Sequence, residues 1–262
     1  MLLALDIGNT AITIGVFDGE ELRARWSIAT DVENLVDEYA ILLLNLLRTE
    51  NLSAADVDEA ILGSVVPSLT PVFQDVCRRY FSVTPLVVDL GVRTGVRIMY
   101  DSPRDVGADR VIDAVAAIKL YGPPLIVVDF GTATVFDAIS KDGDYLGGAI
   151  APGIGISMEA LFERTAKLPR IELERPKTAI GKTTVVAMQS GIVFGYVGLI
   201  EGIVARMKEE LEGDVKVIAT GGLAPLIARE TPVIQAVNLD LTLVGLRLIQ
   251  EANRGQGTVN RA

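Results

Sequence analysis

The sequence contains no histidine and a single cysteine, Cys77. Without histidine there is no Ser-His-Asp or Cys-His catalysis, no histidine metal site and no ordinary proton shuttle at neutral pH. One cysteine excludes an intramolecular disulfide and a zinc site built from several cysteines. Any general base is therefore expected to be a carboxylate. Cys77 is expected in the core, because nothing around it in the sequence would lower the pKa of a thiol.

Long apolar runs are also missing, although 50% of the 262 residues are hydrophobic. No run reaches the roughly 18 residues that a membrane span needs, and the richest stretch, residues 41–47, is typical of a buried helix. The chain does not open with the basic and apolar segments of a signal peptide. We expect a cytoplasmic protein that has no membrane partner.

Positive charge is scarce, with 24 Lys and Arg against 34 Asp and Glu and a formal net charge of −10. Long-range electrostatics therefore oppose binding to nucleic acid and to anionic lipid. An anionic substrate would need cationic side chains placed locally.

An internal repeat is the strongest feature that is present. Residues 2–10 (LLALDIGNT) align with residues 125–134 (LIVVDFGTAT), about half the chain apart. In both copies an apolar run ends in Asp-x-Gly followed by Asn or Thr, and a second β-type run follows. This pattern predicts a strand, a glycine turn and a strand, made twice.

The rest of each half alternates strand and helix, which predicts an α/β protein with a duplicated ribonuclease H-like fold of the actin-like ATPase type. Two mixed-sheet halves, residues 1–122 and 123–252, are expected around a central cleft, followed by a flexible tail at 253–262. Further strands are predicted at residues 23–28, 60–66, 85–88 and 215–219, and helices at 33–48, 69–81, 183–211 and 240–252. Ligands in such sheets collect at the carboxyl ends of strands, where the two glycine turns lie.

The two glycine turns are candidates for phosphate binding. Asn9 and Thr10 offer short polar side chains beside exposed amides, and Asp6 would face Mg²⁺, through water. In the second copy the hydroxyl and amide of Thr132 suit an ATP phosphate, while Asp129 supplies negative charge for a cation. The alternatives are an ordinary hairpin turn for the first copy and a structural cap for Asp129.

Two other motifs carry polar or glycine-rich turns. Residues 219–222 (ATGG) end an apolar strand before a helix, which suits either an adenosine site or a simple turn. Asp109 and Arg110 fall in the first turn of a predicted helix. The helix dipole stabilises a carboxylate there and should lower the pKa of Asp109, so an ordinary helix-end residue is one explanation of this aspartate. The same dipole disfavours a cation in the first turn, and this misplacement favours an anion-binding role for Arg110.

Six motifs follow one another in an order that resembles the bacterial type III pantothenate kinases. They are residues 6–10 (DIGNT), 107–110 (GADR), 129–133 (DFGTA), 147–153 (GGAIAPG), 187–191 (AMQSG) and 219–222 (ATGG). The first motif is shared by the whole actin-like superfamily. GADR together with the GGAI motif resembles this family alone, and the resemblance covers about residues 2–250.

The resemblance implies transfer of the ATP γ-phosphate to the terminal hydroxyl of pantothenate, on the way to coenzyme A, with Asp109 as the proton acceptor. It implies pantothenate contacts from Tyr100, Gly107, Ala108, Asp109, Arg110 and Thr184. It implies ATP contacts from Asp6, Ile7, Gly8, Asn9, Thr10, Ala11, Ile12, Thr13 and Thr132. Asp6 would face Mg²⁺, and Asp129 would bind the monovalent cation, K⁺ or NH₄⁺.

The sequence departs from the family pattern at Thr183, where Asn is common, and at Val135, where a second Thr is common. Two rival functions remain: another acceptor-specific kinase of the same fold, such as a sugar or acetate kinase, and an ATP-binding transcriptional accessory protein without turnover.

The helix predicted at 183–211 carries a glycine stripe, which we define as Gly191, Gly195, Gly198 and Gly202. Glycine costs a helix about 1 kcal/mol relative to alanine, so close packing should compensate for the stripe. Packing inside the chain is one explanation. The dimeric assembly of the family favours the other, a homodimer.

Overall fold

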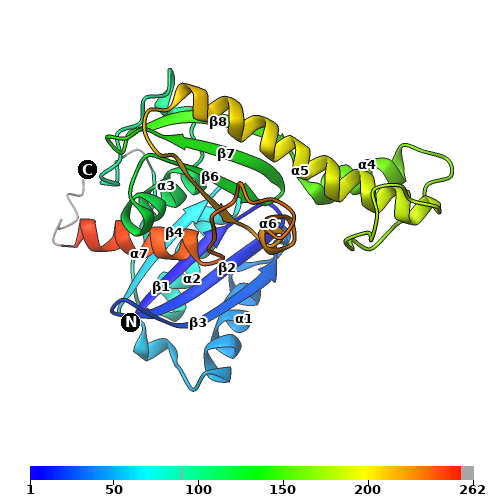
Figure 1. Cartoon of the computed structure of the whole chain (residues 1–262). Helices are drawn as coiled ribbons and strands as arrows, with labels where there is room; N and C mark the ends of the chain where they lie inside the picture. Colours follow the sequence, from blue (N-terminus) through cyan, green and yellow to red (C-terminus); the bar gives the residue numbers. More distant parts are fainter. Residues whose placement is uncertain (90, 255–262) are drawn as a thin grey trace. The chain divides into compact units, whose positions relative to one another are not determined.

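The computed structural model describes residues 1–89 and 91–254, and the chain divides into two compact units (Figure 1). Unit 1 comprises residues 1–96, 102–116 and the chain from 241 onward, and unit 2 comprises residues 97–101 and 117–240. A single boundary after residue 122 does not describe this division. The reason is helix α7 (Leu241–Asn253), which packs on strands of the first half instead of the second.

Unit 1 is built on a mixed five-stranded sheet in the order β3-β2-β1-β4-β5. Its strands are β1 (Leu2–Ile7), β2 (Ala11–Asp18), β3 (Glu21–Ala29), β4 (Glu59–Ser64) and β5 (Leu86–Val87). β1 pairs antiparallel with β2 and parallel with β4, β2 pairs antiparallel with β3, and β4 pairs parallel with β5.

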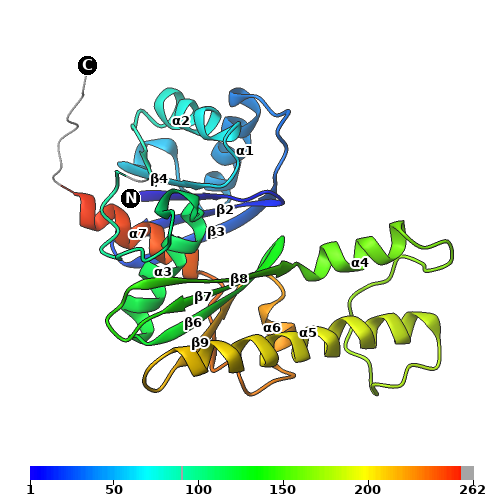
Figure 2. The ribbon, with the colours of Figure 1, turned by 90° about the horizontal axis from the view of Figure 1, so that it is seen from above.

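The central strands β1 and β4 bury side chains on both faces of this sheet, since successive side chains of a strand point to opposite faces. Leu3 and Leu5 of β1 lie in a cluster with α1 (Val36–Thr49) and α2 (Leu69–Tyr80). Leu2 faces the other side, where the sheet packs against α7 and the first turns of α3 (Ala108–Tyr121). Figure 2 shows α1 and α2 on one side of the sheet and α7 and α3 on the other.

Unit 2 repeats the same plan in the order β10-β9-β6-β7-β8. Its strands are β6 (Leu125–Phe130), β7 (Ala133–Ile139), β8 (Tyr145–Pro152), β9 (Lys216–Thr220) and β10 (Ala236–Val237). β6–β7 and β7–β8 are antiparallel, and β6–β9 and β9–β10 are parallel, the same relations as in unit 1. The predicted duplication is confirmed, since the two units match strand for strand.

The helices of unit 2 are α4 (Ile154–Glu163), α5 (Thr184–Glu210) and α6 (Ala224–Ala228). Ile126 and Val128 of β6 form a core with one side of α5 and with α6. α4 packs along α5, and in both views the two helices extend together beyond the sheet of unit 2 (Figures 1 and 2).

The predicted helices and strands are confirmed to within a few residues, and three strands or α-helices of the described residues were not predicted: β8, α4 and the two-residue β10. β8 contains Gly147, Gly148 and Ala149, which lack the β-branched and aromatic side chains typical of strands. α4 follows it directly. The first helix begins at Val36, later than predicted, because Leu35 is its N-cap and donates its backbone N–H to the Glu38 carboxylate. Two short 3-10 helices span Ala54–Asp56 and Pro103–Asp105.

α5 is long and apolar enough to cross a membrane by length and composition, and 39% of its most apolar window is buried inside the protein. It is a core helix of unit 2, with Val193, Ile200 and Val204 buried. Core helices of this kind meet the same length and composition test as membrane spans.

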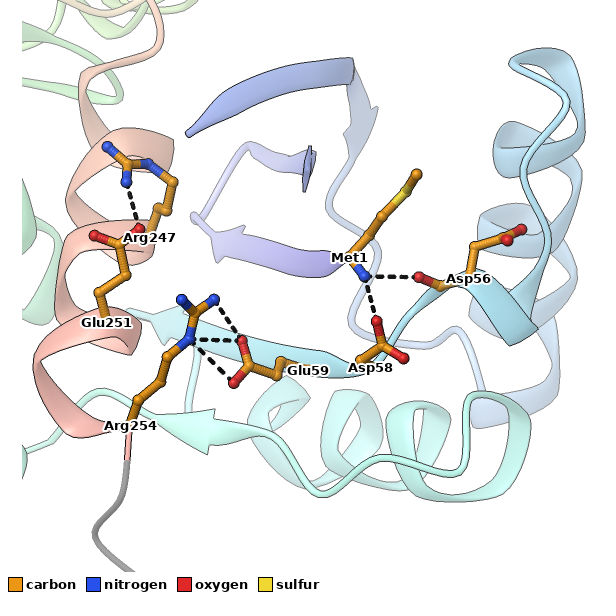
Figure 3. A network of polar contacts seen from close by, with 7 residues as sticks. All are labelled: Met1, Asp56, Asp58, Glu59, Arg247, Glu251 and Arg254. Carbon is orange, nitrogen blue, oxygen red and sulfur yellow. Dashed lines mark hydrogen bonds and ion pairs between the residues drawn. The ribbon is translucent and has the colours of Figure 1, made fainter. Parts of the chain in front are cut away.

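The first two residues of the tail predicted at 253–262 are placed in the structure. Asn253 is still helical, and the guanidinium of Arg254 donates to both carboxylate oxygens of Glu59 at the start of β4, at 2.8–3.2 Å (Figure 3). Just before the start of β4, the Met1 ammonium lies 2.6 Å from the Asp58 carboxylate. Residues 255–262 of the predicted tail lie outside the described residues.

Candidate functional site

The first glycine turn, residues 8–10, joins β1 to β2 in unit 1. The amide of Gly8 donates to the carbonyl oxygen of Ala11 at 3.1 Å, and a Cβ at position 8 would lie 2.9 Å from that oxygen. Asn9 and Thr10 are exposed, and Asp6 is half-buried at the end of β1. The turn therefore presents short polar side chains at the carboxyl end of a central strand, as predicted.

Thr30, which the sequence analysis did not single out, holds this turn from the end of β3. Its hydroxyl donates to the carbonyl oxygen of Gly8 at 2.6 Å, and its amide donates to the carbonyl oxygen of Thr10 at 3.0 Å. Only the register of β2 against β3, which brings Ala29 beside Ala11, places Thr30 there. No local sequence signal could have identified it.

The second glycine turn, residues 131–132, joins β6 to β7 in unit 2 and is one residue shorter than the first. The backbone of Gly153, at the start of α4, lies against it, since a Cβ at Gly153 would be 2.1 Å from the carbonyl oxygen of Thr132. This close approach explains the last glycine of the GGAIAPG motif. Thr132 is exposed, as a phosphate ligand must be.

Asp129 is half-buried and lies between two glycines. A Cβ at Gly221 would be 2.6 Å from its Oδ1, and a Cβ at Gly131 would be 3.2 Å from its Oδ2. Gly221 also has a φ of +88°, a conformation that glycine adopts without strain. Gly221 was assigned to an adenosine site or a simple turn, and the structure adds that it leaves room for the Asp129 carboxylate.

Among the described residues, no group of three or more Asp, Glu, Cys or His side chains forms a metal cage. A magnesium ion bound with a nucleotide does not need one, because Mg²⁺ keeps several waters and takes one or two carboxylates together with phosphate oxygens. A single carboxylate at Asp6, at the end of the central strand β1, fits that donor set.

Asp109 lies in the first turn of α3, where its carboxylate folds back over the preceding glycine. Its Oδ1 accepts the backbone N–H of Arg110 at 2.9 Å, and a Cβ at Gly107 would lie 2.4 Å from the same oxygen. Glycine at 107 is therefore needed for this carboxylate position. The GADR motif, residues 107–110, lies in unit 1 at the start of α3, the helix that the sequence predicts there.

Burial raises the pKa of Asp109 above the ordinary value for an aspartate, although the N–H and charge of Arg110 act in the opposite direction. The prediction of a lowered pKa was wrong. The helix terminus favours the charged form, but desolvation of a carboxylate held among protein atoms opposes it and dominates here. A raised pKa makes Asp109 a stronger proton acceptor. Arg110, the last residue of the GADR motif, is also buried, with 8% of its surface exposed.

Tyr100 and Thr184 both belong to unit 2. Tyr100 is half-buried and its ring lies beside that of Tyr145, with centroids 6.5 Å apart. Thr184 is exposed and is the first residue of α5.

The two departures from the family pattern have local consequences. The Thr183 hydroxyl accepts the amide of Val186 at 3.2 Å and caps α5, a role that Asn fills equally well. Val135 lies directly opposite Asp129 in the β6–β7 ladder. The threonine hydroxyl that is common in the family, and absent here, would therefore stand on the residue paired with Asp129.

Two surface hollows of about 240 and 510 Å³ lie elsewhere and include none of the predicted site residues. The smaller is lined by α4 and residues 170–171, and the larger by residues 54–58 and 80–83.

A model of the family described as "Type III pantothenate kinase" matches residues 2–206. The chain belongs to this family. It is 53% identical to the type III pantothenate kinase of Syntrophus aciditrophicus over 97% of this chain and 100% of that protein. It is 51% identical to that of Moorella thermoacetica, with the same coverage. The GADR and GGAI motifs thus lie in a chain that aligns with type III pantothenate kinases over nearly its whole length.

The fold is shared more widely than the family. The activator of 2-hydroxyisocaproyl-CoA dehydratase from Clostridium difficile, solved with bound ADPNP, superposes with a TM-score of 0.57 at 13% identity. The alignment covers 97% of this chain and 96% of that one. The actin-like, sugar-kinase-like fold class predicted from the repeat is confirmed.

Proposed function

We propose that the protein transfers the γ-phosphate of ATP to the terminal hydroxyl of pantothenate, the first step of coenzyme A synthesis. The family supplies the reaction, and the observation that carries it in this chain is the half-buried Asp109 carboxylate folded over Gly107. Its raised pKa suits a group that must take a proton from an alcohol.

The roles of the residues follow from the chemistry of phosphoryl transfer. The transition state is largely dissociative, so the attacking oxygen needs alignment early and loses its proton late. Asp109 orients the pantothenate hydroxyl and accepts its proton, and Arg110 offers positive charge to an anionic substrate. The other proposed contacts to pantothenate come from Tyr100, Gly107, Ala108 and Thr184.

ATP is assigned to residues 6–13 and Thr132, whose turns expose amides and hydroxyls for phosphate oxygens. When bound, Mg²⁺ would neutralise negative charge on the phosphates, with Asp6 facing it through water. Asp129 is assigned to K⁺ or NH₄⁺ by its resemblance to the monovalent-cation ligand of the family, and its half-buried carboxylate at the end of β6 is compatible with that role.

A homodimer formed through α5 is part of the proposal. Apart from the neighbouring turns of α5 itself, none of the described residues lies within 4 Å of where a Cβ would stand at Gly191, Gly195 or Gly198. Packing within the chain therefore does not compensate for the cost of these three glycines, which is about 1 kcal/mol each. A second copy of the chain packed on the stripe would do so. We place this enzyme in the cytoplasm, where its substrates are made and used.

One assay tests the reaction. ADP release coupled to a reporter enzyme is measured with ATP, Mg²⁺ and K⁺, with pantothenate, a hexose or acetate as acceptor. Of the three acceptors, only pantothenate should support turnover, and mass spectrometry should find phosphopantothenate. Faster turnover with the sugar or acetate would favour the rival kinases. ATP binding without ADP release for any acceptor would favour the accessory protein.

A further inference from the structure

Residues 97–101 are attached to the start of β8 in unit 2. Ile98 bridges to Tyr145, the amide of Met99 donates to the Tyr145 carbonyl oxygen at 2.8 Å, and the Tyr145 amide donates to the Arg97 carbonyl oxygen at 2.9 Å. Outside this ladder, Nε of Arg97 donates to the carboxylate of Asp144 at 3.0 Å. The backbone of Tyr145 therefore sets the position of the segment that carries Tyr100.

The side chain of Tyr145 is held from the opposite end. The ring is fully buried, and its hydroxyl donates to Oδ1 of Asp137 in β7 at 2.7 Å. Asp137 is only 2% exposed, and the proposed phosphoryl transfer gives it no role. A hydrogen bond between two side chains buried this deeply restrains the hydroxyl end of the Tyr145 ring.

The ring of Tyr100 is located by two contacts on the same strand. It lies beside the Tyr145 ring, at an interplanar angle of 50°. A Cβ at Gly147 would be 3.1 Å from Cε2 and 3.2 Å from Cδ2 of Tyr100, and Gly147 has a φ of +120°. Glycine at this position lets the tyrosine ring lie on the backbone of β8.

We propose that Tyr145 and Asp137 are positioning residues for Tyr100, and that the hydroxyl–carboxylate bond between them tightens the binding of pantothenate. The inference rests on the proposed function, in which Tyr100 contacts pantothenate. A contact that is held in place before the substrate arrives loses less conformational freedom on binding, so it contributes more to affinity. Loosening the Tyr145 side chain should therefore weaken pantothenate binding and leave the affinity for ATP unchanged.

The test is Tyr145→Phe, which removes the hydroxyl and keeps the ring. KM for pantothenate should rise about tenfold, the equivalent of about 1.4 kcal/mol, while KM for ATP stays at the wild-type value. Asp137→Asn keeps an oxygen that can accept from Tyr145 and should lie closer to the wild type. The matched control is Tyr196→Phe, which deletes another buried hydroxyl of unit 2, bonded to the carbonyl oxygen of Pro152 at 2.7 Å. It should leave KM for pantothenate unchanged.

A double-mutant cycle with Tyr100→Ala decides whether the effect passes through Tyr100. Tyr145→Phe should raise KM for pantothenate in the wild-type background and have no further effect when Tyr100 is absent. An unchanged KM in Tyr145→Phe, an equal rise for both substrates, or a full additional effect in the Tyr100→Ala background would each overturn the inference. Failure of the wild-type enzyme to phosphorylate pantothenate would instead overturn the proposed function, before any variant is compared.

Discussion

The hydroxyl of Thr30 donates a 2.6 Å hydrogen bond to the carbonyl oxygen of Gly8, which ties the end of β3 to the first glycine turn. This bond fixes the backbone whose amides are proposed to bind ATP phosphates.

Thr30→Val should loosen that turn and raise KM for ATP about fivefold, the equivalent of about 1 kcal/mol for one neutral hydrogen bond. KM for pantothenate should hardly change. Thr49→Val is the matched control, since the Thr49 hydroxyl also donates to a carbonyl oxygen at 2.6 Å, that of Leu46 at the end of α1. Steady-state kinetics with each substrate varied in turn checks both variants, and equal effects of the two would contradict the role of Thr30.

Asp109→Asn should lower kcat by about 10² to 10⁴-fold, the usual contribution of a general base. ATP affinity should hardly change, because the phosphates are assigned to other residues. Asp105→Asn, an exposed carboxylate just before α3, serves as the control and should keep wild-type kcat. An Asp109→Asn enzyme within about tenfold of the wild type would remove Asp109 from the role of base.

The same substitution should stabilise the fold at neutral pH. Burial raises the pKa of Asp109, so the folded protein favours the protonated form more than the unfolded chain does. The stability that this group contributes is present below its unfolded pKa and is lost as the pH rises through the folded pKa. At pH 7 burial of this acid therefore costs stability, and asparagine, which does not ionise, avoids that cost. Tm should be higher for Asp109→Asn than for the wild type at pH 7, and the difference should shrink near pH 4. A lower Tm at pH 7 would show that desolvation does not dominate.

Activity should depend on a monovalent cation through Asp129. Replacing K⁺ by Na⁺ should lower kcat sharply in the wild type, and Asp129→Asn should be slow in both salts. Asp142→Asn, an exposed carboxylate of the same unit, should keep the wild-type preference for K⁺. Equal wild-type rates in the two salts would assign Asp129 another role.

Gly195→Leu should shift the mass measured by light scattering from dimer towards monomer. The position is exposed, and among the described residues outside the neighbouring turns of α5 nothing lies within 4 Å of an added Cβ. Asn45→Leu adds the same side chain to an exposed position of α1 and should leave the mass unchanged. A Gly195→Leu protein that remains dimeric would place the glycine stripe outside the interface.

The sequence by itself determined the duplicated fold, the two glycine turns and the start of α3 at the GADR motif. Each depends on local regularities: apolar runs with the period of a strand, glycines where a turn is needed, and a helical spacing of apolar residues. Residues 6–10 and 129–132 were identified in this way, and their turns follow the strands as predicted.

Only the tertiary structure decided which groups are buried together. The pKa of Asp109 is raised because burial excludes water from its carboxylate, whereas the local helix terminus would lower it. Helix α7 packs on the first sheet although all of unit 2's helices precede it in the sequence. Strand register brings Thr30, Tyr145 and Asp137 to their hydrogen-bond partners. Burial and cross-strand contact depend on residues far apart in the chain, so a local pattern does not contain them.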